Sequence, residues 1–238
     1  ATNLGMTNVT AGAWGASQPA AFMSWYEAAA FVNWLNTSTG HQAAYNLTYS
    51  GSWSMSLWSS GDAWQLGGEN LYRHKDAYYF LPSEDEWYKA AYHKNDGVTA
   101  NYWDYATGSN TAPTAVANGT TAGTAVYNGA AGSPAAVNSA GGLSPYGTMG
   151  QNGNVWEWNE SAFYGLNISS SEIRANRGGS WYYPEFYLRA STRYGDDPTD
   201  SDDSIGFRVA SVPEPSAAVL MLSGLGAWLL KRRANRSL

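Results

Sequence analysis

Three glycine-containing motifs near the C-terminal end constrain the fold of this chain more than any other feature. They are Gly153-Asn154-Val155-Trp156-Glu157-Trp158, Arg177-Gly178-Gly179-Ser180-Trp181 and Gly206-Phe207-Arg208. The whole chain shares their bias, with 26 Gly, 12 Trp and 17 Tyr among 238 residues. We expect one compact, loop-rich domain in which aromatic side chains fill the core and glycines permit tight backbone turns.

The charge pattern and the lack of cysteine exclude several classes of function. The sequence contains no cysteine, so disulfides, thiolate metal sites and cysteine nucleophiles are excluded together. The net charge is −6, yet basic residues are concentrated at the C-terminal end, and residues 1–211 carry 9 basic and 18 acidic side chains. Nucleic acid is therefore not expected as a partner of so acidic a body.

Two helix starts are indicated by capping boxes. In each, a serine side chain can accept from the amide three residues later while a glutamate at that position reaches back: Ser24 with Glu27, and Ser83 with Glu86. We expect helices after both serines, with the acidic residues as caps rather than catalysts.

Residues 95–144 are rich in Ala, Gly, Thr, Asn and Ser, and this composition predicts a long loop. A similar Ser/Trp-rich insertion is expected at residues 50–68.

In their order along the chain, the motifs resemble those of the formylglycine-generating enzyme family, also called sulfatase-modifying factor domains. Two upstream segments, Met23-Ser24-Trp25-Tyr26-Glu27-Ala28-Ala29 and Tyr79-Phe80-Leu81-Pro82-Ser83-Glu84-Asp85-Glu86-Trp87, are similar to family segments as well. The resemblance covers about residues 18–209. It implies an α+β fold, a loop-rich variant of the C-type lectin-like fold with short strands and a few helices. The family's first strand and helix would precede Gln18, so we expect part of the N-terminal region to be missing.

The resemblance also brings out what this chain lacks. Enzymes of the family carry two copper-binding cysteines between the Gly-Gly-Ser and Gly-Phe-Arg motifs, whereas this interval here holds tyrosines and a glutamate. Without thiolates no soft copper site can form, so copper is not expected, nor is oxidation of a sulfatase cysteine. A second enzymatic branch of the family, the iron-dependent sulfoxide synthases, uses histidines from an additional domain. The three histidines of this chain, His41, His74 and His93, show no metal-ligand spacing. We expect them to be ordinary polar surface residues.

Calcium is the metal that the resemblance leaves open. It implies carbonyl ligands from Gly153 and Val155 and a carboxylate from Glu157, all hard oxygen ligands that suit Ca²⁺. The family usually has Asn or Asp three residues before this glycine, where this chain has Gly150. The alternative is that Glu157 is buried and bonded to backbone amides or to an arginine such as Arg208.

A segment rich in tyrosine and aspartate, between Trp181 and Asp203, is the candidate ligand surface. Tyrosine gives a large contact area at low entropic cost and carboxylates add polar specificity, a composition common in recognition surfaces. The alternative is that the tyrosines pack into the core and the aspartates solvate a loop. Arg189, Arg193 and Arg208 are expected to anchor ion pairs. The candidate binding residues are Tyr182, Tyr183, Glu185, Tyr187, Tyr194, Asp196 and Asp197.

Residues 1–211 are expected to form the domain, and residues 212–238 a separate C-terminal tail. They contain Pro213-Glu214-Pro215, an apolar run at 217–230 that predicts a helix, and a basic end at 231–236. This three-part pattern resembles the PEP-CTERM sorting signal of bacterial surface proteins. The resemblance implies export, transient retention in the bacterial inner membrane through the C-terminal helix, and cleavage by an exosortase-type enzyme. The domain would then stay at the cell surface or become extracellular.

Three functions stay open on the sequence. The first is an exported, surface-sorted, non-catalytic binding or structural module with an unknown ligand, a glycan or a protein. The second is an enzyme on the same scaffold whose chemistry needs no cysteine, and a polar cleft with ionisable groups converging near Glu185 and Asp196 would support it. The third is a protein that assembles extracellular matrix or biofilm.

Overall fold

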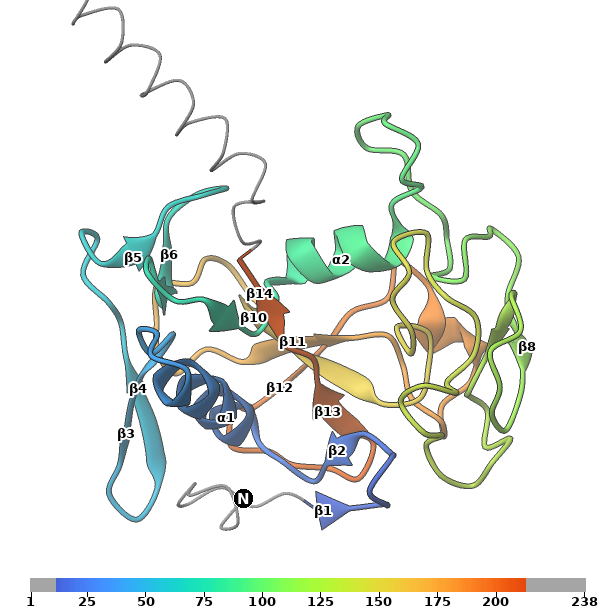
Figure 1. Cartoon of the computed structure of the whole chain (residues 1–238), viewed down its shortest axis with the longest axis horizontal. Coiled ribbons are helices and arrows are strands. Elements are labelled where there is room, and N and C mark those ends of the chain that lie inside the picture. The colour runs from blue at the N-terminus through green and yellow to red at the C-terminus, as the bar shows by residue number, and fades with distance from the viewer. Residues whose placement is uncertain (1–11, 213–238) are drawn as a thin grey trace, which may run out of the picture.

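The computed structural model describes residues 12–212 and has a mixed four-stranded sheet at its centre (Figure 1). The strands follow the order β12 (Tyr194–Asp196), β11 (Arg174–Arg177), β10 (Trp156–Ala162) and β13 (Ile205–Phe207). β10 is antiparallel to β11 and parallel to β13. Glu157 is paired with Arg177 on one side and with Gly206 on the other. The three glycine motifs therefore meet across this sheet.

Both predicted helices are present and begin where the capping boxes place them. α1 (Trp25–Ser38) is capped by Ser24 and α2 (Glu84–Tyr92) by Ser83, and the reciprocal glutamate bond is formed in each. These signals are local in sequence, because the side chains that cap a helix lie within one turn of its first residue. The buried residues are Trp25, Tyr26, Ala28, Ala29, Val32 and Asn36 in α1 and Trp87, Ala91 and Tyr92 in α2.

The two helices lie on opposite faces of the central sheet. Successive side chains of a strand point to opposite faces, and Glu157 and Trp158 follow each other on β10. Glu157 accepts a hydrogen bond from the Trp87 indole of α2 at 2.5 Å. Trp158 instead donates its own indole N–H to the carbonyl of Met23, just before α1, at 3.1 Å. Trp158 and Trp25 belong to the larger hydrophobic core, and Trp87 to a second, smaller one.

Pairs of short strands surround this centre. β1 (Gly12–Ala13) is antiparallel to β2 (Ala20–Ala21), and β7 (Tyr79–Phe80) is antiparallel to β14 (Ala210–Ser211). The Ser/Trp-rich insertion contributes to two antiparallel strand pairs rather than forming a plain loop. These elements are β3 (Asn46–Tyr49) with β4 (Trp53–Ser56), and β5 (Ala63–Trp64) with β6 (Asn70–His74).

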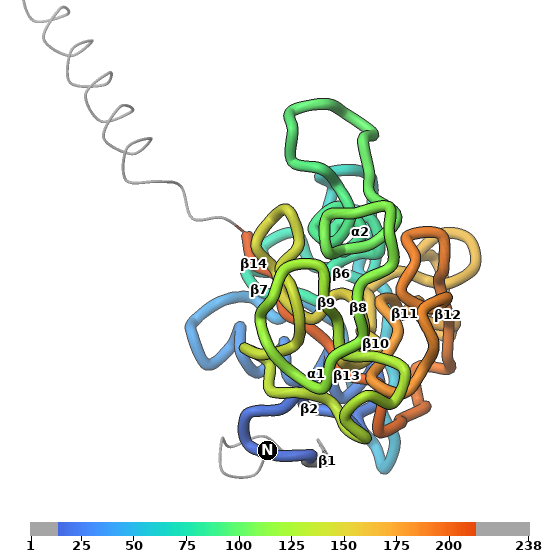
Figure 2. The backbone as a smooth tube through the Cα atoms, turned by 90° about the vertical axis from the view of Figure 1, so that its right-hand side faces the viewer, coloured from blue at the N-terminus to red at the C-terminus, as the bar shows by residue number. Residues whose placement is uncertain are grey.

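Residues 95–144 form the long loop segment that the composition predicts, drawn green to yellow-green in Figure 2. Its regular structure is limited to the parallel pair β8 (Thr114–Ala115) and β9 (Thr124–Ala125) and a few isolated bridges. Backbone hydrogen bonds fasten it to the tyrosine-rich segment, from Asn128 to the Tyr183 carbonyl at 2.9 Å and from Gly129 to the Trp181 carbonyl at 2.7 Å. The loop is therefore held against the candidate ligand surface.

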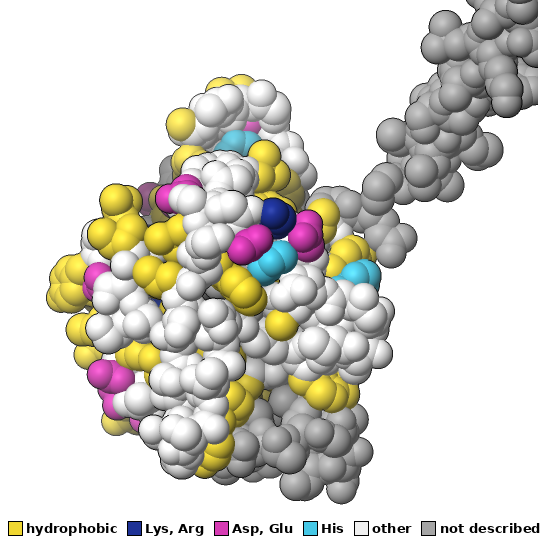
Figure 3. All heavy atoms as spheres, turned by 90° about the vertical axis from the view of Figure 1, so that its left-hand side faces the viewer, with side chains coloured by type: hydrophobic (Ala, Val, Ile, Leu, Met, Phe, Trp, Pro, Cys, Tyr) yellow, Lys and Arg dark blue, Asp and Glu magenta, His cyan; other side chains and the backbone are white. Residues whose placement is uncertain are grey.

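The class is α+β, dominated by short strands with small helices, as expected. The face in Figure 3 carries few charged side chains, in keeping with a chain in which 13% of residues are charged. No helix within residues 12–212 is both long and apolar enough to span a bilayer. The predicted sorting motif (Pro213, Glu214, Pro215), the apolar run and the basic end lie outside the described residues.

Candidate functional site

A small pocket lies where β12 and the start of β13 meet the tyrosine-rich segment. Its volume is about 280 Å³. The central sheet positions it, because β10, β12 and β13 each contribute a side chain and the aspartate-rich turn before β13 supplies its rim. We call it the acidic aromatic pocket. Its lining consists of Trp156, Tyr183, Tyr194, Asp196, Asp200, Ser201, Asp202, Ser204 and Ile205.

Three aromatic rings form one wall of this pocket. The Trp156 ring, which is almost fully buried, lies 6.0 Å from that of Tyr183 and 5.8 Å from that of Tyr194, measured between ring centroids. Tyr187 packs against both Trp156, at 5.7 Å, and Tyr183, at 5.0 Å. Tyr187 therefore supports the wall without lining the pocket, while about half of the Tyr194 side chain stays exposed.

Three aspartates supply the charge of the pocket. Burial raises the pKa of Asp196, the hydrogen bond from Asn176 Nδ2 at 2.7 Å lowers it, and repulsion by Asp200 and Asp202 raises it, so that it lies above its ordinary value. Asp202 is held by Ser204, whose backbone N–H and Oγ donate to its Oδ1 at 2.8 and 2.6 Å. The pocket lining contains no lysine or arginine. The negative charge is therefore not compensated within the pocket.

The structure brings together only part of the predicted binding set. Tyr183, Tyr194 and Asp196 line the pocket, whereas Tyr182 is 64% exposed and does not. Glu185 points elsewhere, because its carboxylate is bonded to Arg189 at 3.0 Å and to the Tyr105 hydroxyl.

Asp197 closes a local turn, accepting from the backbone N–H and Oγ1 of Thr199 at 2.9 and 2.6 Å. The set of candidate residues did not include Trp156, Asp200 and Asp202. The two aspartates lie in the aspartate-rich segment that the sequence already indicates as the candidate surface. Trp156 carries no such signal, because only strand pairing brings β10 beside this segment.

Glu157, the predicted calcium ligand, is held by protein donors. Its two carboxylate oxygens accept from Nη2 and Nε of Arg208, both at 2.5 Å, and one of them also accepts from Trp87. Arg208 Nη2 donates in addition to the Met149 carbonyl at 3.1 Å. This is the alternative that the sequence left open. The residues in this arrangement do not fit a calcium ion, because a guanidinium already neutralises the only carboxylate of the set. Calcium at Gly153, Val155 and Glu157 stays a prediction that requires Arg208 to move.

A chelation experiment tests this point. Because Arg208 already supplies a positive charge to Glu157, we expect the melting temperature to be the same, within about 1 °C, with excess EGTA and with millimolar CaCl₂. The Arg208→Gln variant removes the guanidinium charge and serves as the comparison, since a vacated carboxylate is where calcium would gain affinity. A calcium-dependent rise in the melting temperature of the unaltered protein would instead establish the calcium site.

Two of the three histidines correct the expectation of surface residues. His74 is buried and packs its ring edge-on against Trp58, with a centroid distance of 4.7 Å. His93 is buried too, and its two ring nitrogens are bonded to the Val98 carbonyl at 2.9 Å and the Tyr146 hydroxyl at 3.0 Å. His74 is the last residue of β6 and His93 the first residue after α2, and each ring accepts a hydrogen bond from the backbone N–H two residues later. His41 is exposed as expected and stacks on Tyr78.

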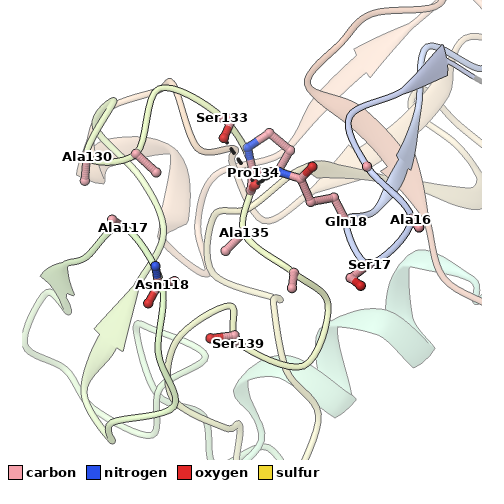
Figure 4. Close-up of a pocket in the computed structure, with 13 residues that line it drawn as sticks. Ala16, Ser17, Gln18, Ala117, Asn118, Ala130, Ser133, Pro134, Ala135 and Ser139 are labelled. Atoms are coloured by element: carbon pink, nitrogen blue, oxygen red, sulfur yellow. Dashed lines mark hydrogen bonds between the residues drawn. The ribbon is translucent and has the colours of Figure 1, made fainter.

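A cavity of about 800 Å³ lies between the segment around Gln18 and two parts of the long loop (Figure 4). Gln18 reaches across to the carbonyl of Pro134. The cavity wall consists of Gly, Ala, Ser, Asn, Gln and Pro, without charged or aromatic side chains. It therefore offers far weaker recognition chemistry than the acidic aromatic pocket.

Comparison with known families and curated proteins identifies relatives of the whole domain. The model of the family described as "Sulfatase-modifying factor enzyme 1-like domain" matches residues 7–212. "Inactive C-alpha-formylglycine-generating enzyme 2" of Mus musculus is 34% identical over 84 residues, 29% of this chain and 26% of that protein. The protein of the same name from Bos taurus is 35% identical over 71 residues, 28% of this chain and 23% of that protein. The chain thus spans about a quarter of the length of these curated relatives.

Solved structures share the fold at low sequence identity. "Treponema denticola variable protein 1" aligns with a TM-score of 0.53 and 20% identity, covering 87% of this chain and 76% of that one. CarF aligns with a TM-score of 0.56 and 22% identity, covering 84% and 70%. Identities this low establish a common fold and nothing about ligands.

Proposed function

We infer the function from one premise: this chain belongs to the family of the sulfatase-modifying factor enzyme 1-like domain. From it we propose an exported, non-catalytic binding module on a formylglycine-generating-enzyme-like scaffold, of the C-type lectin-like class. The observation that carries the proposal lies between the Gly-Gly-Ser and Gly-Phe-Arg motifs. Where the resemblance places two cysteines, this chain has Tyr183 in the wall of a pocket, and it contains no cysteine anywhere. The names of two mammalian relatives, which describe them as inactive, also support a non-catalytic function.

An oxidase assay tests the non-catalytic part of the proposal. Purified protein is incubated with copper, oxygen and a cysteine-containing sulfatase peptide, and the aldehyde is detected by hydrazide labelling. We expect no aldehyde above the blank of copper and peptide, because no thiolate can hold the metal. A cysteine-containing family enzyme serves as the positive control. Aldehyde that appears with this protein and is absent from the blank would refute the proposal.

The alternative of an enzyme with cysteine-independent chemistry has less support. Ionisable groups converging near Glu185 and Asp196 would support it, but Glu185 is bonded to Arg189 and Tyr105 and does not line the pocket of Asp196. Conversion of a bound ligand by the purified protein would favour this alternative.

The other alternative, matrix or biofilm assembly, predicts concentration-dependent association of the protein. Sedimentation velocity measures this association directly.

We also propose that residues 212–238 sort the domain. The Pro213-Glu214-Pro215 motif, the apolar run and the basic end support export, recognition by an exosortase-type enzyme and release to the cell surface. In a bacterial host that contains such an enzyme, deletion of residues 213–238 should abolish cleavage and change the fraction in which the domain is recovered.

A further inference from the structure

We propose that the acidic aromatic pocket binds a primary ammonium group carried by a small organic ligand, such as an amino sugar or a lysine side chain. The inference rests on the proposed function, because it names the chemical class that the binding module would take. The uncompensated charge, the aromatic wall and the size of the pocket support it.

The carboxylates of the pocket have no cation of their own, because the arginines of residues 12–212 are committed elsewhere. They pair with glutamates or stack on rings as follows: Arg73 with Glu86 and Glu160, Arg177 and Arg193 with Glu84, Arg189 with Glu185, Arg208 with Glu157, and Arg174 over Trp25 and Tyr72. No cation lines the pocket beside Asp196. Burial of its carboxyl group and repulsion by Asp200 and Asp202 both raise its pKa. A ligand cation relieves that repulsion and favours the charged carboxylates.

A buried amide behind the pocket holds Asp196 in place. Asn176 is fully buried, and its Nδ2 donates to Asp196 Oδ2 at 2.7 Å. Asn176 does not itself line the pocket, so the Asp196 carboxylate is the group that faces a ligand. Carboxylates accept hydrogen bonds and donate none when charged. A primary ammonium has three N–H donors, whereas a quaternary ammonium has none.

The aromatic wall and the size of the pocket favour an organic cation over a metal ion. A cation within about 6 Å of a tryptophan or tyrosine ring face is attracted by the ring quadrupole, and Trp156, Tyr183 and Tyr194 offer such rings. Within residues 12–212, no group of three or more His, Asp or Glu is arranged to hold a metal. The volume of about 280 Å³ lies below the roughly 300–1,000 Å³ of drug-sized pockets. It suits one sugar ring or one side chain.

Calorimetric titration of the whole chain with matched amine and amide probes tests the inference. The amines are glucosamine and Nα-acetyl-lysine methylamide, and their uncharged partners are N-acetylglucosamine and the Nε-acetylated lysine derivative. The titrations are run at about pH 6.5, where the amine probes are protonated. We expect at least one amine to bind, and its acetylated partner to bind at least about tenfold more weakly. The glucosamine and lysine arms distinguish the two sources of the ammonium group.

Three variants locate the binding. Asp196→Asn and Asp200→Asn keep the size of the side chain and remove its charge, and each should weaken amine binding about tenfold or more. Asp85→Asn removes the same charge from an exposed position on α2, on the other face of the sheet. It should change the affinity less than twofold. Thermal melting confirms that all three variants are folded.

Three outcomes would overturn the inference: equal binding of amine and amide, amine binding that survives both pocket substitutions, and no amine binding at millimolar concentrations. Equal binding of N-acetylglucosamine would reject the cation while leaving a binding module in place. The proposed function fails on a different result, aldehyde formation in the copper assay. The two failures are therefore distinguishable.

Discussion

Replacement of Arg73 by methionine is expected to lower the free energy of unfolding by about 3–5 kcal/mol and the melting temperature by about 6–20 °C. Arg73 is 1% exposed, and its Nη2 lies 2.7 Å from Glu160 Oε2, which is fully buried. Its guanidinium also lies 3.7 Å from the centroid of the Phe80 ring. Without Arg73, the Glu160 carboxylate would still accept from the Asn70 amide, at 2.5 Å, but it would lose its ion-pair partner. An uncompensated buried charge is what makes the loss large.

Two further variants separate this effect from general disruption. Arg73→Met combined with Glu160→Gln removes both charges and should lose less stability than Arg73→Met alone. Lys75→Met removes a cation that lies 3.6 Å from Asp62, with both side chains about half exposed. Surface pairs of this kind contribute little, so its effect should stay within about 0.5 kcal/mol. Urea unfolding at neutral pH measures all three. A loss below about 1 kcal/mol for Arg73→Met would contradict the buried-charge explanation.

The pH dependence of the Arg73 effect follows from its second partner. Burial alone would raise the pKa of Glu86, but the hydrogen bonds and the charge of Arg73 outweigh it and hold this pKa below its ordinary value. The pairing therefore stabilises the fold fully above the unfolded-state pKa of about 4.3. Its contribution is lost as the pH falls through the lower folded-state value. The difference in stability between the wild type and Arg73→Met should narrow in acid accordingly.

Replacement of Gly153 by alanine is expected to cost about 3 kcal/mol or more, although it adds a single methyl group. Gly153 has a φ of +77°, and a Cβ built there lies 2.1 Å from the carbonyl oxygen of Val126 and 2.9 Å from its carbonyl carbon. Both are backbone atoms, so neither can turn aside as a side chain does. The N–H of Gly153 also donates to the Gly178 carbonyl at 2.7 Å. The first and second glycine motifs are therefore joined at this close crossing.

Gly165→Ala is the matched control for this substitution. Gly165 has a similar φ of +71°, but no atom lies within 4 Å of its Cβ position. Its replacement should cost only the conformational penalty, about 1–2 kcal/mol. The difference between the two variants isolates the contact with Val126, and chemical denaturation of both measures it. If both variants lost the same free energy of unfolding, the contact between a Cβ at residue 153 and Val126 would not explain the cost of Gly153→Ala.

The resemblance and the structure explain the glycine of the first motif differently. The resemblance implies a carbonyl ligand for calcium, although Gly150 stands where the family usually has a side-chain ligand. In the structure, the same residue is required to be glycine because a strand from the long loop passes against it at Val126. That neighbour is separated from Gly153 by 27 positions of irregular chain, so no periodicity or spacing could have revealed the contact.

Features that depend on neighbours in sequence were predictable. The capping boxes at Ser24 and Ser83 each lie within one helical turn and form as expected. The ion pairs of Arg189, Arg193 and Arg208 were expected, and each arginine indeed contacts a glutamate. Their partners were mostly not predictable. Glu84 was expected to act as a helix cap residue, yet it binds both Arg177 and Arg193.

The sequence by itself determined the family, the α+β class, the two helix starts and the absence of any thiolate chemistry. Each of these depends only on which residues are present or on residues that are close together in the sequence. Tertiary structure alone decided which candidates form a site. Pairing of β10, β11 and β12 places Trp156 beside Tyr194 and Asp196, while Glu185 is drawn to Arg189 and Tyr105 instead. The physical reason is that strand register fixes which distant side chains share one face, whereas composition fixes only which side chains are available.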